Sequence, residues 1–126
     1  EKGLEGKVFF PGVSDRIFEI LSTCETFVLP SNFEGMPNTL IEAMCIGLPC
    51  ISTKVSGATD LIKDGENGLL IDIDNEEQLF YAMVKLAENP EIRLRMGINA
   101  TKLYNYLNVN TILEEWYKYI IGYIEC

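Results

Sequence analysis

Short apolar runs alternate with stretches of helical periodicity over the first part of the chain. Nearly continuous apolar runs, bounded by turn residues, predict four strands, at residues 7–10, 26–29, 50–52 and 69–71. Apolar positions three and four residues apart predict helices between them, at residues 15–22, 39–46 and about 58–62. Because the strands are apolar throughout, they are typical of strands that are covered on both faces.

The rest of the chain has helical periodicity only. Residues 75–88 predict one helix, and Asn89-Pro90 then breaks the chain. Pro90 can open a second helix that reaches about residue 106, and residues 110–123 predict a third. Strands that alternate with helices are joined by right-handed crossovers, so the pattern predicts an α/β fold with a parallel sheet over residues 1–74 and a helical part over 75–126.

Composition narrows the class of protein. The 126 residues suit one domain, and 48% apolar residues are enough for a core. A net charge of −9 argues against a nucleic-acid surface, which needs a basic stripe. No apolar run approaches the ~20 residues of a membrane helix, and the polar first residues show no signal peptide. The chain lacks a starting Met and reaches strand-like sequence almost at once, so we expect it to begin inside a longer protein.

Four cysteines stand at positions 24, 45, 50 and 126, with no CxxC pair and no histidine in the chain. This pattern excludes a Cys/His zinc site and any Ser-His or Cys-His catalytic pair. We expect the cysteines to be small buried hydrophobes in a reducing compartment.

Candidate chemistry lies in the loop after the second strand, because open parallel sheets bind ligands beyond the carboxyl ends of their strands. Gly35 allows close backbone approach, and Asn38 or Thr39 can cap the next helix, whose first N–H groups form an anion site. Glu34 at the loop tip and Glu42 on the predicted first turn suit hydroxyl groups rather than phosphate. A sugar nucleotide has phosphate in its middle and hydroxyls on both sides.

Simpler interpretations exist for these acidic residues. Glu42 can merely favour the positive end of the helix, and Glu34 can be a solvated loop residue. Asp72-Ile73-Asp74 has the spacing of a metal-binding D-x-D, but it precedes a predicted helix. We therefore expect Asp74 or Asn75 to act as an N-cap and predict no metal site there.

The wider sequence carries a resemblance. Glu34 and Glu42 form an E-x7-E motif inside SNFEGMPNTLIEAMCIGLPCIST (31–53), which resembles the donor-binding signature of family-4 (group 1) retaining glycosyltransferases. Further similar segments follow in the family's order: VFFPGV (8–13), FVLPS (27–31), GATDLIKDGENGLLI (57–71) and LAENPEIRLRMG (86–97). Family members commonly have Ala-Asp before the FVLPS-like strand, where this chain has Cys24-Glu25.

The resemblance implies a fold and an activity. The family has two Rossmann-like domains facing across a cleft, the GT-B arrangement, and residues 1–126 would be part of the C-terminal, donor-binding one. The implied reaction moves a sugar from a nucleoside diphosphate to a saccharide or glycoconjugate acceptor, with retention of configuration, in surface polysaccharide biosynthesis.

The resemblance also assigns roles within the site. Glu34 would orient the donor sugar at the reacting carbon, and Glu42 would accept hydrogen bonds from the ribose. Thr39 would approach the phosphates, and Val13 would lie near the nucleobase. The sugar and diphosphate would be lined through backbone groups by Gly35, Met36, Pro37 and Asn38.

Further expectations concern partners and place. The resemblance implies no cofactor, a metal-independent site and an N-terminal acceptor domain missing from this chain. The acidic net charge argues against a nucleic-acid partner. It also implies a cytoplasmic protein, with peripheral contact to the inner face of the membrane through the missing domain. The 126 residues alone are expected to be inactive.

Alternatives remain open at this point. The chain can instead be a non-catalytic nucleotide-sugar-binding or interaction module, and an unrelated doubly wound signalling domain is a third possibility. On the last predicted helix, Trp116, Tyr117 and Tyr119 are expected to belong to a helix core. Their alternative is an exposed surface that another domain covers.

Overall fold

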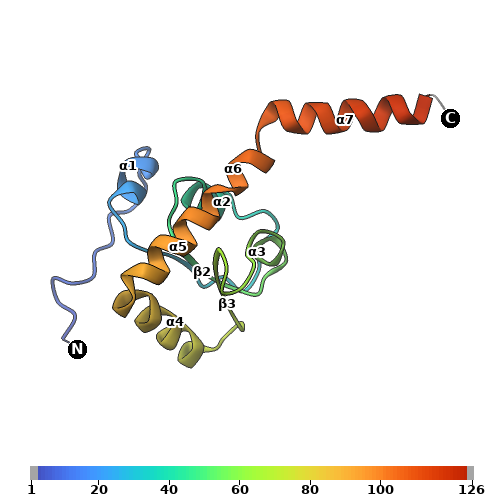
Figure 1. Cartoon of the computed structure of the whole chain (residues 1–126). Helices are drawn as coiled ribbons and strands as arrows, with labels where there is room; N and C mark the ends of the chain where they lie inside the picture. Colours follow the sequence, from blue (N-terminus) through green and yellow to red (C-terminus); the bar gives the residue numbers. More distant parts are fainter. Residues whose placement is uncertain (1–2, 125–126) are drawn as a thin grey trace.

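The protein is a three-stranded parallel sheet flanked by helices (Figure 1). The computed structural model describes residues 3–124, and the side chains of residues 3–121. The strands lie in the order β1 (Phe27–Leu29), β2 (Cys50–Thr53) and β3 (Gly68–Ile71). The central strand pairs with both neighbours, with Val28 opposite Ile51 and Ile51 opposite Leu69. The predicted α/β class and parallel pairing are confirmed.

The elements follow the predicted alternation closely. All four residues of the central strand are buried, as expected for a strand covered on both faces. The elements are α1 (Ile17–Ser22), β1 (Phe27–Leu29), α2 (Asn38–Cys45), β2 (Cys50–Thr53), α3 (Ser56–Leu61), β3 (Gly68–Ile71), α4 (Glu76–Glu88), α5 (Pro90–Thr101), α6 (Leu103–Tyr106) and α7 (Val109–Ile124). Pro90 opens α5 as predicted, whereas the helix predicted to reach residue 106 is interrupted at Lys102.

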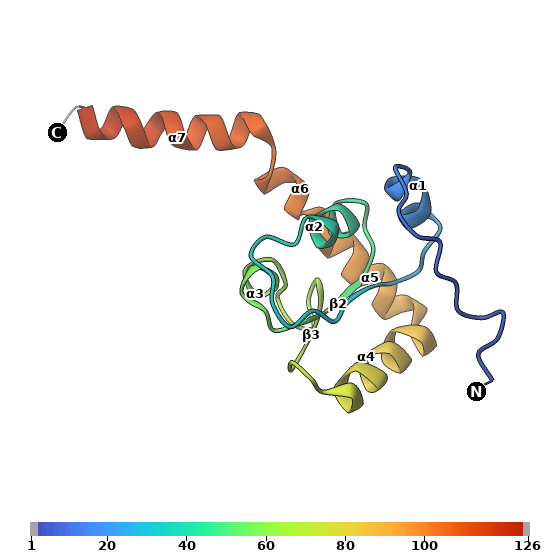
Figure 2. The same ribbon diagram turned by 180° about the vertical axis from the view of Figure 1, so that it is seen from behind.

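The strand predicted at residues 7–10 does not form. The segment 3–16 runs as a coil away from the sheet (blue trace in Figures 1 and 2), and Phe10 is 91% exposed. A strand needs a neighbour for its backbone N–H and C=O groups, and this segment pairs with none of the described strands. Its apolar residues alone therefore do not make it a strand.

Two apolar clusters cover the two faces of the sheet. Cys50 belongs to the first cluster and the next residue, Ile51, to the second, because successive side chains of a strand point to opposite faces. The first cluster includes Leu40, Met44, Leu48, Val55, Ala58, Ile62 and Ala100. The second contains Leu69, Ile71, Ala82, Leu86 and Met96. Burial on both faces explains why the strands read as continuous apolar runs.

Helix α5 crosses directly over the end of α2. Gly47 follows the C-cap residue of α2 with φ +86°, the left-handed conformation that commonly ends a helix. A Cβ on Gly97 would stand 2.2 Å from the carbonyl oxygen of Gly47. The absence of a side chain on Gly97 permits this contact, which holds the C-terminal helical part against the sheet layer.

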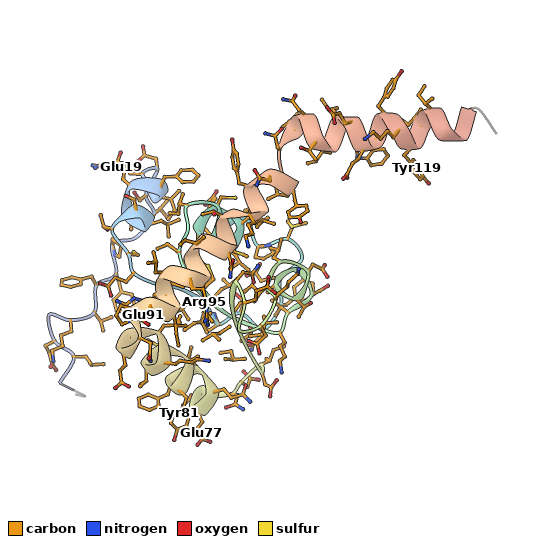
Figure 3. The ribbon with its side chains drawn as sticks, viewed as in Figure 1. Glu19, Glu77, Tyr81, Glu91, Arg95 and Tyr119 are labelled. Carbon is orange, nitrogen blue, oxygen red and sulfur yellow. The ribbon has the colours of Figure 1, made fainter. Side chains whose placement is uncertain are left out.

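Helix α7 projects from the body of the molecule (Figures 1 and 2). Its aromatic residues are exposed, at 60% for Trp116, 67% for Tyr117 and 62% for Tyr119, so their predicted place in a helix core is wrong for this structure. Trp116 and Tyr119 stack edge to face with ring centroids 6.3 Å apart, and Figure 3 shows Tyr119 well away from the sheet. None of the described helices combines the length and apolar character needed to cross a bilayer.

The cysteines differ in environment more than predicted. Cys50 is buried and Cys45 partly buried, whereas Cys24 is exposed, so the expectation of burial is wrong for Cys24. Cys126 lies outside the described residues. Burial raises the pKa of the Cys50 thiol to about 12 and raises that of Cys45 as well.

We expect alkylation to separate these thiols. Against an ordinary value of 9.0, the raised pKa leaves Cys50 with about a thousandfold less thiolate, the reactive form, at mildly alkaline pH. In the native protein, iodoacetamide should modify Cys24 first, Cys45 more slowly, and Cys50 only after addition of denaturant, as followed by mass spectrometry of tryptic peptides. Equal native rates at Cys24 and Cys50 would contradict this packing.

Candidate functional site

The carboxyl ends of the three strands meet at one edge of the sheet, around a cavity of about 210 Å³. Its lining includes Pro30 directly after β1, Thr53 at the end of β2, and Asp72 directly after β3. This is the edge at which open α/β sheets bind ligands. The candidate loop, residues 30–37, leaves β1 at this edge and leads into α2.

Glu34 is held by the loop rather than solvated at its tip. Its carboxylate oxygen Oε1 accepts a hydrogen bond of 2.8 Å from the Ser31 hydroxyl, and the side chain is half-buried. The carbonyl of Ser31 in turn accepts a hydrogen bond of 2.5 Å from the hydroxyl of Thr53. The acidic side chain is thus connected to the end of the central strand.

Gly57, on α3, lies directly beneath the same loop. A Cβ at this position would stand 2.1 Å from the carbonyl oxygen of Gly35 and 2.6 Å from Cδ of Pro37. The glycine is therefore required by contact with the loop backbone. Pro37 is buried by this packing, whereas Gly35 and Met36 are exposed.

The start of α2 differs in detail from the prediction. Pro37 occupies the N-cap position, and no side chain caps the helix, so neither Asn38 nor Thr39 acts as the predicted cap. The helix begins one residue earlier than predicted, which moves the half-buried Glu42 from the first turn to the second. The first bonded amides are those of Leu40 and Ile41, both to the Pro37 carbonyl.

The amides of Asn38 and Thr39 consequently have no backbone acceptor within the described part of the chain. Both residues are exposed. Their N–H groups stand at the positive end of an eight-residue helix, beside the loop that carries Glu34. The predicted anion-binding arrangement of backbone amides is available here without a side-chain cap.

Val13 does not join the other predicted site residues. It lies in the coil of residues 3–16 and is 105% exposed. The prediction placed it at the end of a strand at residues 7–10. Because that strand does not form in this structure, nothing brings Val13 to the carboxyl edge.

The D-x-D triplet, residues 72–74, has a structural role through Asp72, which is hydrogen-bonded within the fold. The Asn75 side chain caps α4 by accepting a hydrogen bond of 2.9 Å from the Gln78 N–H, as predicted. Asp72 accepts hydrogen bonds from Lys54 Nζ (2.5 Å) and Gln78 Nε2 (2.9 Å). The Lys54 ammonium and the Gln78 amide hold the pKa of the Asp72 carboxyl below its ordinary value, and Asp72 raises the pKa of Lys54. No group of three potential metal-ligating side chains occurs among residues 3–124.

Sequence reasoning missed the residues that support the loop. Ser31, Thr53 and Gly57 gave no motif of their own, since each is defined by a partner at least three positions away. One local signal existed: Ser52-Thr53 ends an apolar strand with two polar residues that both become buried. Buried hydroxyl groups need hydrogen-bond partners, and that requirement pointed to a contact beyond the strand.

An open parallel sheet with helices on both faces and a cavity at its carboxyl edge is the architecture in which α/β proteins bind ligands. The sequence profile of the glycosyl transferases group 1 matches residues 1–103, and the chain belongs to this family. It is 31% identical over 123 residues to a Campylobacter jejuni protein named N-acetylgalactosamine-N,N'-diacetylbacillosaminyl-diphospho-undecaprenol 4-alpha-N-acetylgalactosaminyltransferase. That match covers 97% of this chain and 34% of the relative.

Solved structures show the same fold. A variant of Staphylococcus aureus TarM, in complex with Fondaparinux, alpha-GlcNAc-glycerol and UDP, has a TM-score of 0.85 at 28% identity, over 93% of this chain and 24% of that one. Anabaena HepE in complex with UDP-glucose has a TM-score of 0.83 at 24% identity, over 95% of this chain and 34% of that one. These neighbours are GT-B glycosyltransferases. The chain spans about a third of the length of the curated relatives it matches.

The close contact between Gly57 and the loop predicts that a side chain at position 57 destabilises the protein. Gly57→Ala should lower the free energy of unfolding by about 1–3 kcal/mol, because the atom in the way is a backbone carbonyl that cannot rotate aside. Gly35→Ala is the matched control, since a Cβ there meets nothing within 4 Å. Urea unfolding followed by circular dichroism measures both. Equal stabilities of the two variants would mean that the loop does not rest on α3.

Proposed function

We propose that this chain is the C-terminal, donor-binding part of a retaining glycosyltransferase of family 4, which takes its sugar from a nucleoside diphosphate. The observation that carries the proposal is the half-buried carboxylate of Glu34, oriented by Ser31 beside the open amides of a helix start. Acidic acceptors for sugar hydroxyls and N–H donors for phosphate thus lie on one continuous loop and helix.

In this proposal each part of the donor has its own partner. The exposed amides of Asn38 and Thr39 bind the diphosphate, and Glu42 accepts hydrogen bonds from the ribose. Glu34 accepts them from the sugar. The backbone of Gly35, Met36 and Pro37 lines the space between. The complexes of TarM with UDP and of HepE with UDP-glucose support a nucleotide-sugar ligand, since both proteins contain this fold.

The proposed reaction is a front-face displacement with retention of configuration. The bond from the anomeric carbon to the diphosphate breaks as the acceptor oxygen attacks on the same face. The diphosphate leaves with the bonding electrons, and its departing oxygen takes the proton of the acceptor hydroxyl. Helix-start amides stabilise the charge that develops on the leaving group, without a metal ion. Glu34 positions the sugar and forms no covalent bond to it.

The two edges of the sheet support a larger donor domain. Side chains of this chain accept from the outward N–H groups at β3: the Leu70 N–H donates to Asp64 and, just after the strand, the Asp72 N–H donates to Gln78, both at 2.8 Å. On β1, the Phe27 N–H donates to the Pro49 carbonyl on the β2 side, so the backbone of Val28 faces outward. A cavity of about 260 Å³ lies there, lined by Glu25, Thr26, Val28, Met83, Ala87 and Arg93.

We propose that further strands of the whole protein pair at the β1 edge, and that Val13 meets the nucleobase only within that larger domain. An N-terminal acceptor domain completes the cleft, and it covers part of the exposed aromatic face of α7. On this view residues 1–126 alone transfer no sugar. A chain that spans about a third of its relatives is consistent with this arrangement.

The proposed setting is surface polysaccharide synthesis in the cytoplasm, with the acceptor domain touching the inner face of the membrane. The name of the Campylobacter jejuni relative, which includes diphospho-undecaprenol, supports a lipid-linked acceptor. A panel of UDP-, GDP- and ADP-sugars, titrated into the full-length protein, identifies the donor. Absence of binding to every member would contradict the proposal, and binding without turnover would favour a non-catalytic nucleotide-sugar-binding module.

The role of Glu34 is tested by Glu34→Gln in the full-length enzyme. We expect kcat to fall about a hundredfold while donor affinity changes far less, because the carboxylate aligns the reacting sugar more than it binds the nucleotide. Initial rates and calorimetric donor titration separate the two quantities. Glu77→Gln, on the exposed first turn of α4 (Figure 3), is the control and should leave both unchanged. Equal losses in kcat and affinity at Glu34 would oppose this assignment.

A further inference from the structure

We infer that Thr53 and Ser31 form a positioning pair that sets the orientation of the Glu34 carboxylate for sugar transfer. The inference rests on the proposed function and adds two residues to it. Neither side chain is proposed to touch the donor. The pair acts through the loop, from the end of the central strand to the acidic group.

The connection is short and runs through two hydrogen bonds. Thr53, the last residue of β2, is 3% exposed, and its hydroxyl lies 2.5 Å from the carbonyl oxygen of Ser31. The Ser31 hydroxyl lies 2.8 Å from Oε1 of Glu34. A buried residue at the end of the central strand thus positions the backbone of Ser31, and Ser31 orients the carboxylate.

A purely structural explanation for Thr53 is that any buried hydroxyl must find an acceptor. The neighbouring Ser52 is an example of a buried hydroxyl that only satisfies this requirement. Its hydroxyl, also fully buried, reaches the carbonyls of Leu29 (3.3 Å) and Thr53 (3.1 Å), both within paired strands. Thr53 also lies 3.4 Å from the Leu29 carbonyl, yet its closest acceptor is Ser31, beyond the end of β1.

Only one oxygen of the Glu34 carboxylate accepts a hydrogen bond from the described part of the protein. Oε1 is occupied by Ser31, whereas Oε2 has no hydrogen-bond partner within the described part of the chain. One bond fixes the side-chain rotamer, and the other oxygen stays available to a hydroxyl of the ligand. Gly57 supports the loop from below, so the carboxylate is oriented before the donor arrives and less entropy is lost on binding.

The test uses the full-length enzyme and the sugar nucleotide on which the unaltered enzyme turns over. Thr53→Val removes the hydroxyl at nearly constant volume, and Thr53→Ser keeps it. We expect Thr53→Val to lower kcat about tenfold with little change in KM for the donor, because misplacing a positioning group slows the reacting step. Thr53→Ser should retain kcat within about twofold. Ser52→Ala, the matched control from the same strand, should leave kcat per folded molecule unchanged.

A double-mutant cycle tests whether the two residues act as a unit. If they do, Ser31→Ala lowers kcat about tenfold, and Thr53→Val adds little to it. A hundredfold loss in the double variant would mean independent effects and would overturn the inference. So would equal losses in Thr53→Val and Ser52→Ala, or a loss of thermal stability in Thr53→Val with kcat per folded molecule unchanged.

Failure of the inference is distinct from failure of the proposed function. If Glu34→Gln lowers kcat and Thr53→Val does not, the positioning pair is wrong and the glycosyltransferase assignment stands. If Glu34→Gln keeps full kcat, or no sugar nucleotide is turned over, the proposed function itself fails.

Discussion

Parallel pairing of β2 with both of its neighbours is the interaction on which the rest of the structure depends. Since all three strands run in the same direction, their carboxyl ends meet at one edge, and the segments that follow them are brought together there. The loop that follows β1 carries Glu34, the end of β2 carries Thr53, and Asp72 follows β3. Antiparallel pairing of any one strand would move its following segment to the opposite edge.

Close backbone contacts hold the elements around this edge in place. Gly57 lets α3 approach the loop of residues 30–37, and Gly97 lets α5 approach the end of α2 at Gly47. In both places a side chain on the glycine would meet a carbonyl oxygen at about 2 Å. Helix α2 is therefore fixed at its start by one contact and at its end by the other. Because the start of α2 carries the open amides, these two contacts position the proposed anion site.

The two edges of the sheet differ in whether they can pair with a further strand. Side chains of Asp64 and Gln78 satisfy the outward N–H groups of β3, as expected for an edge strand that must not pair further. The β1 edge differs, because a cavity lies beside it. Apolar side chains of the coil of residues 3–16 and aromatic side chains of α7 are exposed as well. Exposed apolar surface of this extent is typical of a surface that another part of a protein covers. These features agree with a chain that spans about a third of its relatives.

The sequence by itself determined the order and type of most elements, because apolar periodicity and turn residues act over a few positions: β1, α2, β2 and α4 lie within one or two residues of prediction. It also singled out the loop that carries Glu34 and the capping role of Asn75. The strand at residues 7–10 was wrong because pairing requires a neighbour, which local sequence cannot supply. Only the tertiary structure decided that Thr53 reaches Ser31, that Gly57 supports Gly35, and that Val13 stands apart. These contacts depend on residues about twenty or more positions apart in the sequence. Such residues meet only when the sheet and its crossovers have formed.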